Sequence, residues 1–147
     1  DHYFRMSTLY RFIAILSEER QVNQPLASVN SYIANVMTYV RHHLHEHMST
    51  ADIAATMNLN RSYLSSLFRS QTGMTLRSYI QLCRMTRAKY LLESTHLSIA
   101  SIAESCGYEK SDSLNRTFRK TYGIGPADYR KAFLADQAKS SRKPHES

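Results

Sequence analysis

Two groups of short polar and basic side chains recur at helical spacing and could form hydrogen bonds with the base edges of a nucleic acid. The first group lies on the polar face of a helix predicted over residues 61–72, and the second on that of a helix predicted over 111–122. Hydroxyl, amide and guanidinium groups are the donors and acceptors that read base edges in the major groove. The candidate base contacts are Arg61, Ser62, Ser65, Ser66, Ser111, Asp112, Asn115 and Arg116.

Four more basic residues lie at or beyond the ends of helices in the same region, and these are candidate phosphate contacts. They are Arg69, Arg77, Arg119 and Lys120. The chain carries 19 Lys and Arg residues against 12 Asp and Glu residues, for a net charge of +7. This excess suits a polyanionic partner, and we expect double-stranded DNA, with an affinity that falls steeply with salt.

The two helices belong to an internal repeat. The segment 49–54, which reads S-T-A-D-I-A, reappears over 98–103 as S-I-A-S-I-A. Further along, Leu64, Phe68, Arg69, Gly73 and Tyr79 reappear in the same order as Leu114, Phe118, Arg119, Gly123 and Tyr129. A repeated unit of this kind indicates two similar substructures in one chain.

Each copy reads as a short helix, a tight turn and a second helix. Ser49 and Ser98 are predicted N-caps of short helices over 50–57 and 99–106, and Asp52 stands where a capping box needs an acid. Asn58 and Gly107 tolerate the left-handed backbone that ends a helix. This is the helix-turn-helix arrangement.

Apolar residues recur at helical spacing elsewhere too, and no run alternates as a strand would, so the predicted fold class is all-α. It consists of two helix-turn-helix subdomains joined by a central linker helix. The predicted inward-facing residues are Tyr32, Ile33, Val36, Val40 and Leu44 on a helix over 29–45, then Tyr63, Leu64, Leu67 and Phe68, and finally Leu114, Thr117, Phe118 and Thr121.

Three regions follow from this pattern. Residues 1–28 are predicted to be a helix and linker that end an effector or dimerisation domain. Residues 29–134 are predicted to form the tandem unit, with subdomains at about 29–75 and 95–134 and a last helix that ends near Leu134, and residues 135–147 a disordered tail. The joining helix over 76–93 spans roughly 27 Å at ~1.5 Å per residue. Since successive major-groove segments on one side of DNA lie ~34 Å apart, one chain could read two half-sites.

The sequence resembles the DNA-binding domain of the AraC/XylS family of transcription regulators over about residues 30–133. The first half carries Asp52-Ile53-Ala54, Tyr63-Leu64, Leu67-Phe68-Arg69 and Gly73-Met74-Thr75, followed by Tyr79, Arg84, Ala88 and Leu92. The second half carries Ile102-Ala103, Gly107-Tyr108, Arg116-Thr117-Phe118-Arg119-Lys120 and the run from Gly123 to Arg130. The resemblance implies seven helices, two recognition helices in consecutive major grooves, and a bacterial transcription regulator, usually an activator, that acts with RNA polymerase.

The chain departs from the family pattern at three positions. Ser66 stands where relatives commonly carry a basic residue, and Leu114 where they often carry an aromatic one. Asp112 is unusual because an acid near DNA repels phosphate. It either accepts a hydrogen bond from a cytosine amine or forms an ion pair with Arg116 one turn along the helix, and we favour the ion pair.

Other function classes find less support. His43 and His47 share a helix face and could bind a metal, but a solvated helix end explains the cluster of histidines better. No nucleophile, base or phosphate-binding motif indicates an enzyme. A stripe at Leu9, Phe12, Ile13 and Leu16 fits either a protein partner or the core.

We predict no catalytic residues, no metal and no cofactor. The expected partners are double-stranded DNA, RNA polymerase and a second copy of the protein bound through a preceding region, with no membrane association. Cys83 and Cys106 lie in apolar helical patterns, as buried thiols of a reducing cytoplasm would.

Overall fold

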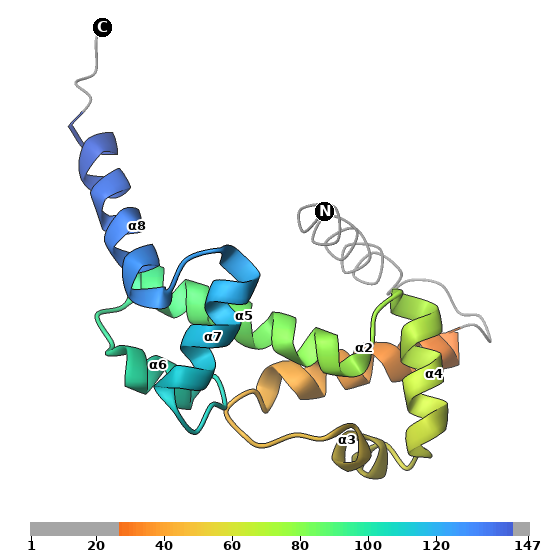
Figure 1. Ribbon diagram of the computed structural model, residues 1–147. Coiled ribbons are helices and arrows are strands. Elements are labelled where there is room, and N and C mark those ends of the chain that lie inside the picture. Colours follow the sequence, from red (N-terminus) through yellow and green to blue (C-terminus); the bar gives the residue numbers. More distant parts are fainter. Residues whose placement is uncertain (1–26, 143–147) are drawn as a thin grey trace, which may run out of the picture. The chain divides into compact units, whose positions relative to one another are not determined.

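The computed structural model describes residues 27–142, and all the regular structure in this part of the chain is helical (Figure 1). This confirms the all-α prediction. The predictions for residues 1–26, including the apolar stripe at Leu9, Phe12, Ile13 and Leu16, lie outside the described residues. The helices are α2 (Ala27–His42), α3 (Thr50–Thr56), α4 (Arg61–Thr72), α5 (Leu76–Ser94), α6 (Ile99–Ser105), α7 (Ser111–Tyr122) and α8 (Pro126–Ser140).

Side-chain caps explain where the short helices begin. The Oγ of Ser49 accepts a hydrogen bond from the backbone N–H of Asp52, and the Asp52 carboxylate accepts one from the N–H of Ser49, each at 3.1 Å. The predicted capping box of α3 is therefore confirmed. The Oγ of Ser98 caps α6 by accepting a hydrogen bond from the backbone N–H of Ser101, at 3.1 Å.

Left-handed residues end the helices that the repeat predicted. After α3, Asn58 has a φ of 55°, and after α6, Gly107 has a φ of 82°. Gly73 and Gly123 are the left-handed C-caps of α4 and α7. A left-handed residue cannot continue a right-handed helix, so these four residues set where the helices of both helix-turn-helix units end.

The described residues divide into two compact units. The first holds residues 27–43 and 48–80, and the second holds residues 44–47 and 81–142. The boundary falls between Ile80 and Gln81, inside α5. The chain therefore passes between the units three times, twice near the end of α2 and once along α5.

The core of the first unit is formed by α2, α3, α4 and the start of α5. From α2 it takes Ile33, Val36, Met37 and Val40, and from the later helices Ile53, Ala54, Leu64, Phe68, Leu76, Tyr79 and Ile80. The rings of Phe68 and Tyr79 pack with centroids 5.5 Å apart. Apolar burial of this kind is the main stabilising term for a small helical unit.

The core of the second unit is a single cluster from α5, α6 and α7. Its buried members are Met85, Ala88, Leu92, Ile102, Ala103, Cys106, Leu114 and Phe118. The ring of Phe118 contacts both Tyr122, at 4.6 Å between centroids, and Tyr129 of α8, at 5.5 Å. Phe118 thus joins α7 to α8.

Two tyrosines predicted to face inward do not. Tyr32 is 43% exposed and Tyr63 is 53% exposed. Each lies directly before a fully buried residue, Ile33 or Leu64, and the narrow apolar stripe of each helix is already filled without it. A tyrosine at the edge of such a stripe keeps its hydroxyl in water, which avoids burying an unpaired polar group.

The ends of α2 and α8 also differ from prediction. Helix α2 ends at His42 rather than near residue 45, and α8 continues to Ser140 instead of ending near Leu134. The disordered tail predicted from residue 135 is therefore wrong for residues 135–140, because Ala135, Gln137 and Ala138 are good helix formers and neither Gly nor Pro interrupts them. Among the described residues, no helix is long and apolar enough to cross a membrane.

Candidate nucleic-acid interface

Helix α4 carries the first group of candidate base contacts. Its start is fixed by Asn60, whose Oδ1 accepts hydrogen bonds from the N–H groups of Ser62 at 2.8 Å and Tyr63 at 3.3 Å. Its inner side is held by Leu64 and Phe68, which have no exposed surface. Because both ends of the helix and its inner side are fixed, its outer side presents a defined surface.

The exposed side of α4 is not quite the predicted one. Arg61, Ser62, Ser66 and Arg69 are exposed as expected, whereas Ser65 is half-buried. The exposed surface extends instead toward Tyr63 and Ser70. Sequence reasoning missed Tyr63 because an aromatic residue beside Leu64 was assigned to the core. Only its place one turn before Ser66 and two before Ser70 marks the exposed side.

Helix α7 carries the second group. Asp112, Asn115 and Arg116 are exposed and Ser111 is half-buried, while Leu114 and Phe118 have no exposed surface. Here the exposed surface extends toward Asn115, and Ser113, which corresponds to Tyr63 in the repeat, is half-buried. The two helices therefore present surfaces that are rotated differently about their axes.

Asp112 has a structural role at the start of α7. The N-cap, Lys110, makes no side-chain hydrogen bond to the first turn, and Asp112 is the acidic residue there. A carboxylate in the first turn stabilises the positive end of the helix dipole. Among the described residues, the ion pairs do not include Asp112 with Arg116, so the favoured ion pair is not seen. Both side chains are exposed.

The candidate phosphate contacts divide between the two units. Arg69 and Arg77 belong to the first unit, Arg119 and Lys120 to the second, and all four side chains are exposed. The guanidinium of Arg119 lies over Gly125, because a Cβ placed on Gly125 would meet its Nη2 at 3.3 Å. Arg119 therefore lies beside the turn between α7 and α8.

Arg130 of α8 holds the end of α5 and the residues that directly follow it. It donates hydrogen bonds to three backbone carbonyl oxygens: Nε to Leu92 at 3.2 Å, Nη1 to Leu97 at 2.6 Å and Nη2 to Thr95 at 3.3 Å. The neighbouring Tyr129 donates its hydroxyl to the Glu93 carboxylate. The first turns of α8 are thus hydrogen-bonded to the end of α5 and pack against Phe118 of α7.

Arg84 holds the segment 44–47 within the second unit. Its Nη2 donates to the carbonyl oxygen of Glu46 at 3.0 Å, and its guanidinium lies 5.6 Å from the ring centroid of Tyr108. The carbonyl oxygen of Leu44 lies so close to Gly107 that a Cβ there would be 2.2 Å away. Glycine at residue 107 therefore serves both the left-handed turn and this close approach.

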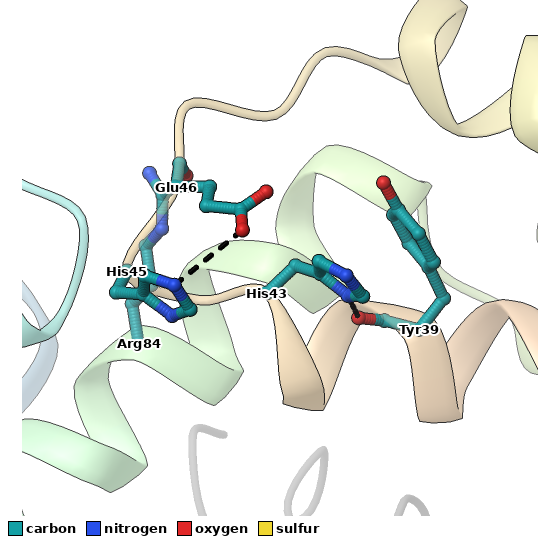
Figure 2. A network of polar contacts seen from close by, with 5 residues as sticks. All are labelled: Tyr39, His43, His45, Glu46 and Arg84. Atoms are coloured by element: carbon teal, nitrogen blue, oxygen red, sulfur yellow. Dashed lines mark hydrogen bonds and ion pairs between the residues drawn. The ribbon is translucent and has the colours of Figure 1, made fainter.

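The histidines after α2 make local contacts (Figure 2). In the first unit, the ring of His43 stacks on Tyr39 with centroids 4.0 Å apart, and its Nδ1 donates to the Tyr39 carbonyl oxygen at 2.7 Å. In the second unit, His45 Nε2 lies 3.4 Å from the Glu46 carboxylate. Within residues 27–142, no group of three or more His, Cys, Asp or Glu side chains could hold a metal ion.

Burial also perturbs one thiol. Cys106 is fully buried in the core of the second unit, while Cys83 is half-buried. Desolvation raises the pKa of the Cys106 thiol to about 11, and the nearby Arg87 and Arg84 lower it only in part. A thiol with a raised pKa is a poor nucleophile, so Cys106 is a packing residue.

Two units, each with a short capped helix, a tight left-handed turn and a second helix with a polar exposed side, define a tandem helix-turn-helix protein. A family model described as a helix-turn-helix domain matches residues 53–132. That stretch runs from the first buried residue of α3 to the middle of α8.

Curated relatives and solved structures agree with this match. The Msm operon regulatory protein of Streptococcus mutans is 34% identical over 126 residues, which cover 84% of this chain and 45% of that protein. The transcriptional activator RhaR of Yersinia pseudotuberculosis is 33% identical over 99 residues, 67% of this chain and 34% of that protein. The DNA-binding domain of AdpA, solved with a target DNA, has a TM-score of 0.69 and 31% identity, covering 72% of this chain and 96% of that one.

The chain belongs to the AraC family of transcription regulators and contains the DNA-binding domain of that family. This confirms the resemblance, the fold class and the general function inferred from the sequence. The family is not enzymatic. The chain spans less than half the length of the curated relatives described above.

Proposed function

We propose that α4 and α7 enter two successive major-groove segments of one DNA site, and that the chain reads this site in a sequence-specific way. The observation that carries the proposal is the shared construction of the two helices. Each has two fully buried side chains on its inner side, Leu64 with Phe68 or Leu114 with Phe118, and polar and basic side chains on its outer side. A recognition helix in the major groove has this organisation.

The proposed base contacts are unequal in strength. On α7, Asn115 can bond both groups of an adenine edge and Arg116 both groups of a guanine edge. Asp112 is free of an ion pair with Arg116, and its carboxylate can accept from a cytosine amine. On α4, Arg61, Ser62, Ser65 and Ser66 complete the candidates, and the serines are short and permissive. We infer that α7 contributes more of the specificity than these α4 residues do.

The proposed phosphate contacts are Arg69, Arg77, Arg119 and Lys120. Their positions at or beyond helix ends favour this role, since the phosphate backbone flanks a helix that lies in the groove. Helix α5, with 19 residues, spans roughly 28 Å at ~1.5 Å per residue. That a joining helix of this length lets one chain read two half-sites ~34 Å apart stays a prediction from the sequence.

We further propose that the whole protein is a transcription activator in a bacterial cytoplasm, with RNA polymerase and a second copy of the protein as partners. Support comes from RhaR, which is named as a transcriptional activator, and from the family resemblance. The dimer would form through a region outside the DNA-binding domain.

Selection of bound duplexes from a random library tests the proposal directly. We expect the wild-type chain to enrich one motif with two separated parts. Arg116→Ala should cost roughly 1–3 kcal/mol of binding free energy and relax the preference at one base pair. Equal weakening on every sequence would show that Arg116 is a phosphate contact, and a wild-type chain with no enriched motif would refute the proposal.

Arg119→Ala is the matched control on the same helix. It should weaken binding uniformly and leave the enriched motif unchanged, because a phosphate contact carries no sequence information. The plot of log affinity against log salt concentration should lose about one unit of slope. A loss of preference at one base pair would instead place Arg119 among the base contacts.

A further inference from the structure

Tyr63 is the one large aromatic side chain on the exposed side of α4, and the function assigned so far does not use it. It is 53% exposed although it lies directly before the fully buried Leu64. Its backbone N–H is fixed by the Asn60 cap at 3.3 Å, so the position of the residue in the first turn is set. The side chain is therefore presented from an ordered point on the helix.

The repeat shows that this exposure is particular to α4. Ser113 takes the corresponding place on α7 and is half-buried, whereas Asn115 there is exposed and its counterpart Ser65 is half-buried. The exposed side of α4 is thus centred near Ser66, with Tyr63 one turn before it. A surface centred on Ser66 brings Tyr63 into the set that faces a bound partner.

We propose that the ring of Tyr63 packs against the C5-methyl group of a thymine in the half-site read by α4. This inference rests on the proposed function of α4. The first turn of a recognition helix contacts base edges, and the thymine methyl is the apolar group displayed in the major groove. Packing removes both the ring and the methyl from water.

The short side chains around Tyr63 favour this contact over one to phosphate. Ser62 and Ser66 flank it on the exposed side, and neither is long enough to hold the helix away from the bases. Arg69, at the opposite end of α4, is placed for the phosphate backbone instead. A serine hydroxyl can pair with either a donor or an acceptor and so distinguishes bases poorly. Tyr63 thereby supplies a base preference that the serines of α4 do not provide.

The experiment compares thymine with deoxyuridine, which lacks only the methyl group, at each thymine of the site selected by the wild-type chain. The half-site of α4 is the one whose preference Arg116→Ala leaves intact. There, one thymine-to-uracil change should weaken wild-type binding about fourfold, the equivalent of one buried methyl group. The readout is fluorescence anisotropy with the full 147-residue chain.

Two variants separate the ring from the hydroxyl. Tyr63→Phe keeps the ring, so it should bind as the wild type does and keep the fourfold penalty. Tyr63→Ala should bind about tenfold more weakly. It should show no penalty for uracil, because the thymine methyl group has no packing partner once the ring is removed. Tyr90→Ala is the matched control, because Tyr90 is a 65% exposed tyrosine on α5, and it should change neither quantity.

Three results would overturn the inference while leaving the proposed function intact. They are a wild-type chain indifferent to every uracil in that half-site, a Tyr63→Ala variant that retains the penalty, and a Tyr63→Phe variant as weak as Tyr63→Ala. The last would indicate a hydrogen bond from the hydroxyl to phosphate. A wild-type chain with no sequence preference at all would overturn the proposed function itself.

Discussion

Replacing Gly107 with alanine tests the packing of the second unit at its tightest point. The residue has a φ of 82°, and a Cβ added there would lie 2.2 Å from the Leu44 carbonyl oxygen and 3.0 Å from Nη2 of Arg84. Ordinary close carbon–oxygen contacts are about 3.3 Å. The backbone of Leu44 would therefore have to move by about 1 Å, and the contact of Arg84 with Glu46 would move with it.

The expected loss of unfolding free energy in Gly107→Ala has two parts. A left-handed conformation costs an alanine about 1 kcal/mol relative to glycine. Overfilling a packed site costs about 1–3 kcal/mol more, because backbone and side chains must shift. Gly107→Ala should therefore lower the free energy of unfolding by about 3 kcal/mol. This is a large share of the stability of a small helical unit.

Gly123→Ala provides the matched control. Gly123 has a φ of 84° and lies in the same unit, but a Cβ there would meet nothing within 4 Å. Gly123→Ala should therefore lower the free energy of unfolding only by the conformational cost, about 1 kcal/mol. Urea unfolding followed by circular dichroism measures both variants. If the two alanines cost the same, the close approach of Leu44 to Gly107 does not exist in solution.

Three further predictions concern the second unit. Arg130→Met should cost about 2 kcal/mol in urea unfolding, because three carbonyl oxygens lose a charged donor, whereas Lys131→Met, at an exposed position, should cost less than about 0.5 kcal/mol. Leu114→Ala should cost about 3 kcal/mol and abolish the base preference of α7 in anisotropy titrations; retained preference would contradict the anchoring role. The pKa of the buried Cys106 thiol is raised from 9.0 to about 11, so its contribution to the free energy of unfolding is complete below pH 9 and is lost as the pH rises through 11, by roughly 3 kcal/mol. Cys106→Ala should remove this part of the pH dependence of stability.

Local signals made most of the fold predictable. The bounds of α4 and α7 agree with the sequence prediction to the residue, because glycine ends each helix and an apolar pair, Leu64 with Phe68 or its repeat, defines the inner side. The N-caps of α3 and α6 were predicted for the same reason. Such signals depend on neighbours within one turn, which the sequence displays directly.

Features set by distant neighbours were not predictable. The contacts of Arg130 with carbonyls near the end of α5 join residues more than thirty positions apart, and nothing local marks them. The exposure of Tyr63 depends on how wide a stripe the rest of the unit can cover. The continuation of α8 past Leu134 is a different case, because it rests on local helix propensity; the prediction of a tail gave the polarity of these residues too much weight. The roles of the candidate DNA contacts stay predictions.

The second unit is discontinuous in sequence. Residues 44–47 contribute the Leu44 backbone that covers Gly107 and the Glu46 carbonyl that receives Arg84, yet both flanking segments belong to the other unit. In a chain cut between Ile80 and Gln81, the C-terminal fragment would lack the Leu44 backbone that packs against Gly107 and the Glu46 carbonyl oxygen that accepts from Arg84. Chimaeras that exchange this half between related regulators must therefore transplant the short upstream tetrapeptide together with residues 81–142.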